Sequence, residues 1–171
     1  KVIASSELTR LKGLSVASFI NVLGTTTWEK NYIYYDSNYL RPIASEKINH
    51  LGGSTKTATL FDFRGKAKET LTKHKRLSNS TEITTKEVFS YDKFERLTKH
   101  THQINNGKVE GLAQNNYSNI GQLASKKVGN TTFSPYQTVD YNYNIRGWLT
   151  QINDITNLGT DLFAYKINYN V

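Results

Sequence analysis

The chain has 171 residues and a formal net charge of +8, because 22 Lys and Arg residues stand against 14 Asp and Glu residues. It contains no Cys, which excludes a disulfide framework, a thiolate zinc site and a cysteine nucleophile. Thr, Asn and Tyr contribute 20, 17 and 11 residues, and this favours an all-β fold, since Thr and Tyr suit half-buried strands and Asn suits turns. No apolar run approaches a membrane span, so we expect no membrane insertion. A chain that starts at Lys1 and lacks Met is expected to be a fragment of a longer one.

The basic residues are scattered along the chain, with local concentrations at 73–76 and 126–127. A nucleic-acid module would gather its Lys and Arg on one helix or stripe with a recognisable motif. Around 66–73 the charges instead alternate with Thr and apolar residues, which places them on the solvated face of a strand. We therefore predict no nucleic-acid partner.

The predicted elements are short strands separated by turns. Only Ser6–Lys12 offers a helical alternative, and a weak one. The segment Gly24–Thr27 predicts a turn, and Asn105-Asn106-Gly107 is a strong hairpin signal. We interpret 1–171 as a single segment of antiparallel hairpins. In chain order, the clearest predicted strands are 14–23, 28–35, 66–73, 83–91, 96–104, 136–143 and 162–169.

Five of the turns share one motif: an aromatic, a short polar residue, a turn and the start of a strand. The leading aromatics stand at positions 35, 61, 91, 117 and 143, so three of the four intervals between them are equal. The polar residue at position two can accept bonds from the backbone two residues on, and Gly at position five permits a positive φ. The residues predicted to build the motif are Tyr35, Asp36, Phe61, Asp62, Gly65, Tyr91, Asp92, Tyr117, Gly121, Tyr143, Gly147 and Trp148.

On these motifs the chain resembles the Rhs/YD-repeat family of large secreted bacterial proteins, whose unit is Tyr-Asp, two variable residues, Gly, Arg, and Leu or Val. The likeness runs from about Gly13 to Asn170. It is strongest over 138–153, which is similar to the segment ahead of the conserved core in Gram-negative members. The motif departs from the family pattern at several positions. These are Ser118 and Asn144 in place of Asp, Glu95 in place of Gly, and one extra residue between Asp36 and Arg41.

The resemblance implies a curved or spiral sheet of hairpins that forms part of a larger shell or barrel. Such a shell encloses a C-terminal toxin or effector domain, and in teneurin-like relatives it is a scaffold for adhesion. The implied partners are the rest of a longer chain and the enclosed effector, with secretion machinery or other strand edges as further possibilities. The implied location is outside the cell or on its surface, in a Gram-negative bacterium. No toxin domain and no self-cutting segment is evident, so no catalytic residue or cofactor is implied.

His100 and His102 are the one metal-like pair, because residues i and i+2 of a strand face the same way and two imidazoles could reach one Zn²⁺. Asp92 and Glu110 are conceivable third ligands from neighbouring strands. Two ligands make only half a site, however, so the favoured interpretation is two histidines on the solvated face of a hairpin.

For hydrolysis, Asp140, Asp154 and Asp161 could pair as acid and base only if the fold brought them together. No Gly-x-Ser-x-Gly elbow, P-loop or Gly-x-Gly-x-x-Gly occurs. We therefore predict a structural protein and not an enzyme, with these carboxylates as turn caps and strand-face polar groups.

The aromatic residues allow two interpretations. They can pack between repeats with their polar atoms bonded at the rim, or form an exposed stacking platform for sugars. Their fixed phase within the repeat favours packing. The residues concerned are Trp28, Tyr91, Tyr117, Tyr143 and Trp148.

The alternative function is a cell-surface binding or adhesion module that recognises an anionic glycan or a protein through its basic and aromatic strand faces. This alternative predicts that five basic residues form one cluster in space. They are Lys73, Lys75, Arg76, Lys99 and His100.

Overall fold

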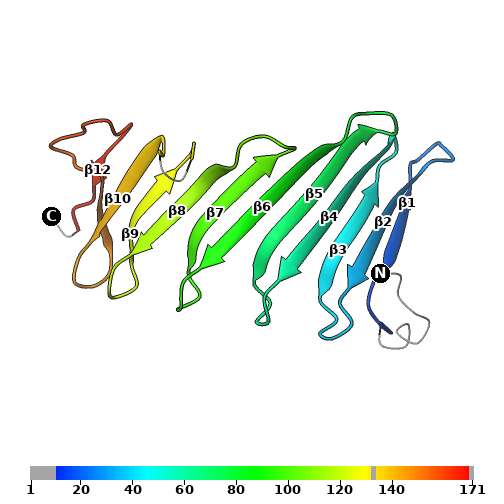
Figure 1. Ribbon diagram of the computed structural model, residues 1–171, viewed down its shortest axis with the longest axis horizontal. Coiled ribbons are helices and arrows are strands. Elements are labelled where there is room, and N and C mark those ends of the chain that lie inside the picture. Colours follow the sequence, from blue (N-terminus) through cyan, green and yellow to red (C-terminus); the bar gives the residue numbers. More distant parts are fainter. Residues whose placement is uncertain (1–10, 132–133, 170–171) are drawn as a thin grey trace. The chain divides into compact units, whose positions relative to one another are not determined.

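The computed structural model describes residues 11–131 and 134–169. Over these residues the regular structure is entirely β: twelve strands follow one another in chain order within an antiparallel sheet that is not closed (Figure 1). The predicted all-β fold of hairpins is therefore confirmed. Within the described residues, no helix is long and apolar enough to cross a membrane. Of the segment Ser6–Lys12, only Leu11 and Lys12 lie among the described residues, and both belong to a turn.

The strands fall into two compact units, residues 1–86 and 87–171, which we describe separately. The last strand of the first unit continues across the boundary. The strands of the first unit are β1 (Ala17–Asn21), β2 (Trp28–Tyr35), β3 (Pro42–Ile48), β4 (Gly52–Phe61), β5 (Ala67–Leu77) and the start of β6 (Ile83–Tyr91). Those of the second are the rest of β6, β7 (Leu97–Ile104), β8 (Glu110–Tyr117), β9 (Leu123–Val128), β10 (Gln137–Tyr143), β11 (Leu149–Ile152) and β12 (Tyr165–Lys166).

One face of the first unit carries a threonine ladder. In β4 and β5, Thr57 lies directly opposite Thr72, and Thr59 lies opposite Thr70. The two hydroxyl oxygens of each pair are 3.4 Å apart. Such cross-strand pairs each stabilise a sheet by a fraction of a kcal/mol, on the order of 0.2–1 kcal/mol. All four threonines are half-buried, which agrees with the expectation that Thr suits half-buried strands.

The opposite face of the first unit carries ion pairs between neighbouring strands. They join Lys56 to Glu46, Lys73 to Glu82 and Lys86 to Glu69, at 3.0, 3.2 and 3.0 Å. In β5 the neighbouring residues Lys68 and Glu69 point to opposite faces, because side chains alternate along a strand. Charges predicted for one solvated face therefore occur on both faces.

The second unit is more clearly two-faced. Along β10, Asp140 and Asn142 are exposed, whereas Val139, Tyr141 and Tyr143 are half-buried. The register places Tyr141 opposite Ile152, so the apolar face of β10 continues onto β11. An antiparallel sheet with this alternation normally has one face toward a core and the other toward water.

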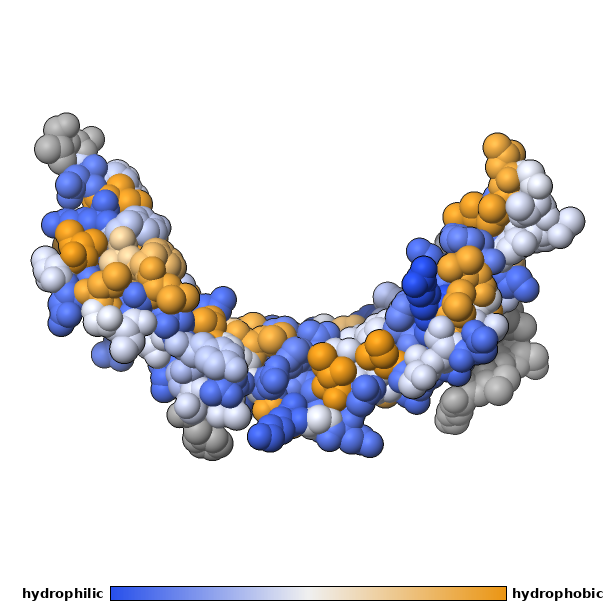
Figure 2. All heavy atoms as spheres, turned by 90° about the horizontal axis from the view of Figure 1, so that it is seen from above, coloured by the Kyte–Doolittle hydropathy of each residue, from blue (hydrophilic) through white to orange (hydrophobic). Residues whose placement is uncertain are grey.

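Few side chains are buried, because the described strands form one layer. Leu11 and Ile152 are the only buried apolar side chains among the described residues. Large apolar side chains such as Leu23, Phe63 and Ile120 are mostly exposed. Apolar residues (orange) accordingly lie at the surface among hydrophilic ones in Figure 2. Contacts along the sheet, rather than a core, therefore hold the strands together.

Candidate functional site

The candidate site is the set of five repeated turns, which share one backbone geometry. The first motif has one extra residue, which we leave uncounted so that Arg41 takes position six. In each turn, the N–H of position two then donates to the carbonyl of position six, over 2.8–3.0 Å. At four of them the strand register also shifts by one residue at the leading aromatic. This geometry is that of a tight hairpin turn followed by a bulge with one left-handed residue. The position-two residues are Asp36, Asp62, Asp92, Ser118 and Asn144.

The left-handed residue lies at position five. Gly65, Gly121 and Gly147 have φ values of 91°, 88° and 80°, as the sequence predicts for these glycines. The structure also gives Leu40 and Glu95 the left-handed conformation, with φ of 55° and 66°. A side chain at such a φ costs about 1–2 kcal/mol, so the turn is imposed by its other bonds even where Gly is missing.

Exchanging Glu95 for Gly or for Ala separates backbone strain from side-chain contacts. Both variants remove the carboxylate, but only Gly relieves the Cβ at φ 66°. We expect Glu95→Gly to be more stable than Glu95→Ala by about 1 kcal/mol. Urea unfolding of the two variants measures this difference. Equal unfolding midpoints and equal urea slopes would contradict a left-handed residue at position 95.

The polar side chain at position two fastens the turn. Asp92 Oδ1 accepts the N–H groups of Phe94 and Arg96, both at 2.9 Å. Asn144 Oδ1 accepts those of Arg146 and Trp148, both at 3.0 Å. Asp62 makes the same two bonds, and Ser118 makes the second of them. The predicted bond to the backbone two residues on is therefore confirmed for Asp and Asn, whereas Ser118 bonds the backbone four residues on.

These bonds favour the charged carboxylate. The pKa of Asp62 lies below its ordinary value of 3.8, chiefly because the Lys66 N–H donates to it, while partial burial opposes the shift. For Asp92, partial burial raises the pKa, but the Arg96 N–H and guanidinium outweigh it and the pKa is lowered.

A lowered carboxylate pKa makes stability depend on pH in a definite direction. The contribution is fully present above the unfolded-state pKa, near 3.8, and is lost as the pH falls through the lower folded-state pKa. We therefore expect the free energy of unfolding to fall between about pH 5 and about pH 2. In Asp62→Asn this decline should be shallower, since the amide oxygen still accepts both N–H groups, as Asn144 does. Urea titrations at successive pH values test this. If the free energy of unfolding of Asp62→Asn falls with pH as steeply as that of the unaltered chain, the prediction is refuted.

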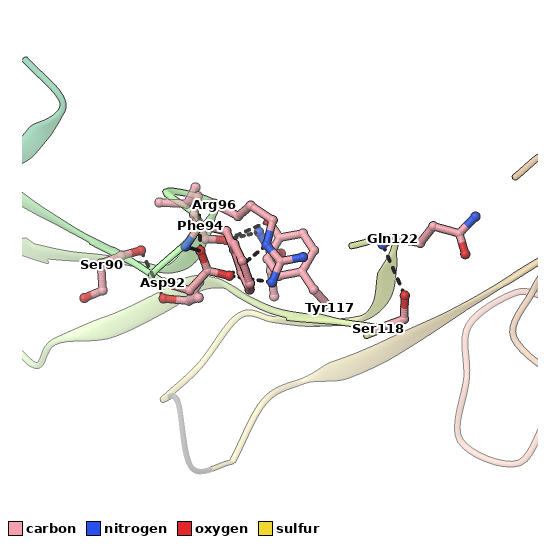
Figure 3. Close-up of polar contacts among 10 residues, drawn as sticks. Ser90, Asp92, Phe94, Arg96, Tyr117, Ser118 and Gln122 are labelled. Carbon is pink, nitrogen blue, oxygen red and sulfur yellow. Dashed lines mark hydrogen bonds and ion pairs between the residues drawn. The ribbon is translucent and has the colours of Figure 1, made fainter. Parts of the chain in front are cut away.

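In several motifs the position-six side chain reaches the next motif. Arg96 binds Asp92 Oδ2 through Nε and Nη2, both at 2.7 Å. Its guanidinium also lies 4.3 Å from the ring centroid of Tyr117, the leading aromatic of the following motif (Figure 3). A Cβ placed on Gly121 would be 3.3 Å from Arg96 Nη1. We call this contact of position six with the following aromatic and glycine the inter-repeat staple.

The staple recurs in the first motif, and its contact with glycine recurs in the fourth. Arg41 binds Asp36, lies 5.5 Å from the Phe61 ring centroid, and its Nη1 would be 2.8 Å from a Cβ on Gly65. Gln122 Nε2 lies 3.4 Å from the corresponding Cβ position on Gly147. Glycine at position five therefore serves two needs, a positive φ and space for the side chain of the preceding repeat.

Packing of the aromatics between repeats is supported for two of the predicted residues. The Tyr117 hydroxyl donates to the carbonyl of Leu97 at 2.9 Å, and Trp148 packs on Tyr169 with ring centroids 5.1 Å apart. Tyr35 bonds in the same way to the carbonyl of Ser15 at 2.8 Å. Trp28 and Trp148 are similarly exposed, but of the two only Trp148 packs on another aromatic ring within the described residues.

The two metal candidates bind different partners. His100 Nε2 is 3.0 Å from Glu87 and its ring stacks on Phe89, whereas His102 Nε2 is 2.9 Å from Glu110. In the described part of the chain, no group of three or more His, Asp or Glu residues gathers that could hold a metal ion. Asp92, the other conceivable ligand, is engaged by its own turn and Arg96.

The hydrolytic candidates have structural surroundings. Asp154 accepts the N–H and hydroxyl of Thr156, at 2.9 and 2.7 Å, and these bonds lower its pKa. Asp140 is exposed on the polar face of β10. Asp161 closes a turn through its N–H, which donates to Leu158. Asp154, whose carboxylate is held charged by these bonds, is poorly suited to act as a general acid.

The predicted basic cluster is divided between strand faces. Lys73 and Lys75 share a face of β5, whereas Arg76 points to the other. Lys99 and His100 are likewise neighbours with opposite orientations in β7. Lys73 is bound to Glu82, which reduces the charge available to an anionic ligand.

The motif residues predicted from the sequence do not include Arg41 and Arg96. The signal is present, because both stand at position six, directly after the left-handed residue.

Comparison of the chain with known family models and with curated proteins finds no match.

Proposed function

We propose that this chain is a structural repeat segment of a large secreted protein of the Rhs/YD-repeat type, in which it encloses or scaffolds another polypeptide. The inter-repeat staple carries the proposal. The staple joins residues of one turn motif to residues of the next. The repeated turn motif, the most regular feature of the sequence, therefore holds neighbouring hairpins in phase. Each hairpin gains its stability from its neighbours, as in other repeat arrays.

The exposure of the strands supports an enclosing role. A single layer of strands leaves apolar side chains such as Val139 and Tyr141 half-buried on one face of the second unit. Covering that face with another polypeptide would remove apolar surface from water, which is favourable by about 25 cal/mol per Å². The proposed cover is an effector domain of the same longer protein.

The adhesion alternative has less support. Its basic residues lie on opposite strand faces, and Lys73 and His100 are bound to Glu82 and Glu87. It predicts binding to a heparin-like polymer at low salt that weakens as salt is raised. Absence of such binding would remove the alternative.

Thiol accessibility in the full-length gene product tests the enclosing role, because this chain has no Cys of its own. Val139→Cys and Asp140→Cys place thiols on opposite faces of β10. We expect the thiol at position 139 to react with a maleimide more slowly in the full-length product than in the isolated chain. The thiol at position 140 is the control and should react equally in both. Equal reactivity of both thiols in the two contexts would overturn the proposal.

A further inference from the structure

The tips of the repeated turns carry exposed apolar side chains, one in each motif at position three or four. In the second unit these are Phe94, Ile120 and Ile145, each at least 65% exposed. In the first unit Tyr39 and Phe63 are likewise mostly exposed. Scattered exposed apolar residues are normal, but one at the same place in every motif is not, and none of them belongs to the inter-repeat staple. Their recurrence therefore indicates a contact with something outside the array.

The three tips of the second unit lie at one end of its strands. They belong to the turns between β6 and β7, β8 and β9, and β10 and β11. Because the strands follow one another in chain order, these alternate turns lie at the same end (Figure 1). Adjacent strands are about 4.8 Å apart, so neighbouring tips are separated by roughly 10 Å. We call Phe94, Ile120 and Ile145 the tip row; it lies at strand ends, apart from both faces of the sheet.

Basic side chains accompany the tip row. Lys93 Nζ lies 5.0 Å from the ring centroid of Phe94, and the Arg146 guanidinium lies 5.3 Å from that of Trp148. At positions three to five of these three turns, Glu95 is the one acidic residue. The whole chain carries a formal charge of +8. This end of the strands therefore presents apolar groups and positive charge together.

The backbone of these turns is bonded internally. The N–H groups of Phe94 and Glu95 both donate to Asp92, one to Oδ1 and one to the carbonyl, each at 2.9 Å. The corresponding two N–H groups of the last turn donate to Asn144 in the same way, at 3.0 and 2.9 Å. Polar groups are expensive to remove from water only when they lack a partner. A turn built in this way can approach an apolar environment at a lower cost.

We propose that the tip row binds the surface of an anionic lipid bilayer. The apolar tips enter the boundary between headgroups and acyl chains, and the neighbouring cations contact acidic headgroups. This contact is peripheral and needs no spanning segment. A soluble anionic polymer would make no use of the apolar tips. A protein partner would require a continuous apolar patch, whereas the tips are roughly 10 Å apart. The proposal does not depend on what the array encloses.

Co-sedimentation with unilamellar vesicles tests the proposal. We expect the chain to bind phosphatidylcholine vesicles that contain about 30% phosphatidylserine at least about tenfold more tightly than pure phosphatidylcholine vesicles, because cations near an anionic surface add to binding. The variant Phe94→Ser/Ile120→Ser/Ile145→Ser should bind the anionic vesicles at least about tenfold more weakly.

The matched control removes exposed apolar side chains at the other end of the strands. Ile104 and Val109 flank the connection between β7 and β8 and are about half exposed. The variant Ile104→Ser/Val109→Ser should bind anionic vesicles as the unaltered chain does. Absence of binding by the unaltered chain, or an equal loss in the two variants, would overturn the proposal.

A fluorescent label locates the contact without altering the other tips. The chain has no Cys, so Ile120→Cys and Val109→Cys give unique attachment sites at opposite ends of the strands. An environment-sensitive dye at position 120 should shift its emission to the blue when anionic vesicles are added, and the same dye at position 109 should not. Equal shifts, or no shift at position 120, would overturn the proposal.

A charge variant separates lipid binding from purely ionic contact. Lys93→Gln/Arg146→Gln should weaken binding to anionic vesicles and leave the weak binding to pure phosphatidylcholine unchanged. If this variant loses binding while the tip-row variant keeps it, the contact is ionic only, as with a soluble anionic polymer, and the proposal fails. None of these measurements involves an enclosed effector, so failure here leaves the proposed function to its own test.

Discussion

Gly53→Ala is expected to lower the free energy of unfolding by about 3 kcal/mol, because a side chain at this position meets backbone. A Cβ on Gly53 would lie 2.0 Å from the carbonyl oxygen of Arg76 in the paired strand β5. The same carbonyl accepts the side-chain amide of Asn49 at 3.0 Å, so β5 cannot move away without breaking that bond. The turn itself would also suffer, since Gly53 bonds to Asn49 through both its N–H and its carbonyl.

Gly24→Ala is the comparison for this substitution, because Gly24 has a positive φ and open space, whereas Gly53 has a clash and no positive φ. Gly24 has a φ of 77°, but a Cβ there would have no atom within 4 Å. It therefore reports the cost of the backbone conformation alone, about 1 kcal/mol. Urea unfolding of both variants, with coincident fluorescence and circular dichroism transitions as a check on two-state behaviour, gives the comparison. A Gly53→Ala loss no larger than that of Gly24→Ala would show that β4 and β5 separate easily.

The contrast between these two glycines shows what the sequence can predict. Alternation and turn chemistry suffice to place strands such as β2 and β6, whose bounds match the predicted 28–35 and 83–91. The phase of the motif also follows from the sequence, because a turn with Asp at position two and Gly at position five has local causes. No local pattern in the sequence identifies Gly53, because the requirement for glycine at this position comes from a carbonyl in another strand.

The sequence shows Arg41 and Arg96 at position six, but what they contact cannot be predicted from it, for a similar reason. The regular interval between leading aromatics places Arg96 and Tyr117 in consecutive motifs, but only the strand register brings the guanidinium over that ring. The short β12, Tyr165–Lys166 within the predicted 162–169, reflects the same limit. Asn153 shows why: its side chain bonds to Asp140 and Phe163, and such long-range bonds to the loop are not encoded in local pattern.

Arg96→Ala is expected to destabilise the chain by about 2 kcal/mol, mainly by removing the inter-repeat staple. The side chain loses its contacts with the rings of Tyr117 and Phe94 and with Gly121. The ion pair with Asp92 adds less, because the Arg96 side chain is about a quarter exposed and the pair is screened by water and salt. Arg96→Lys should lower the free energy of unfolding by about half as much. The lysine keeps the charge and part of the alkyl chain, but its ammonium neither stacks flat on a ring nor donates from a planar fork.

Lys93→Ala is the matched control for charge. Lys93 lies in the same turn and its Nζ is 5.0 Å from the Phe94 ring centroid, but it is exposed and no contact joins it to the next motif's Tyr117. Its removal should change stability by no more than about 0.5 kcal/mol. A double-mutant cycle of Arg96→Ala with Tyr117→Leu should give a coupling of about 1 kcal/mol. Additive losses would mean that Arg96 acts within its own turn only. The hairpins would then be held in phase by their ladder hydrogen bonds alone, and the staple could not carry the structural function proposed for the array.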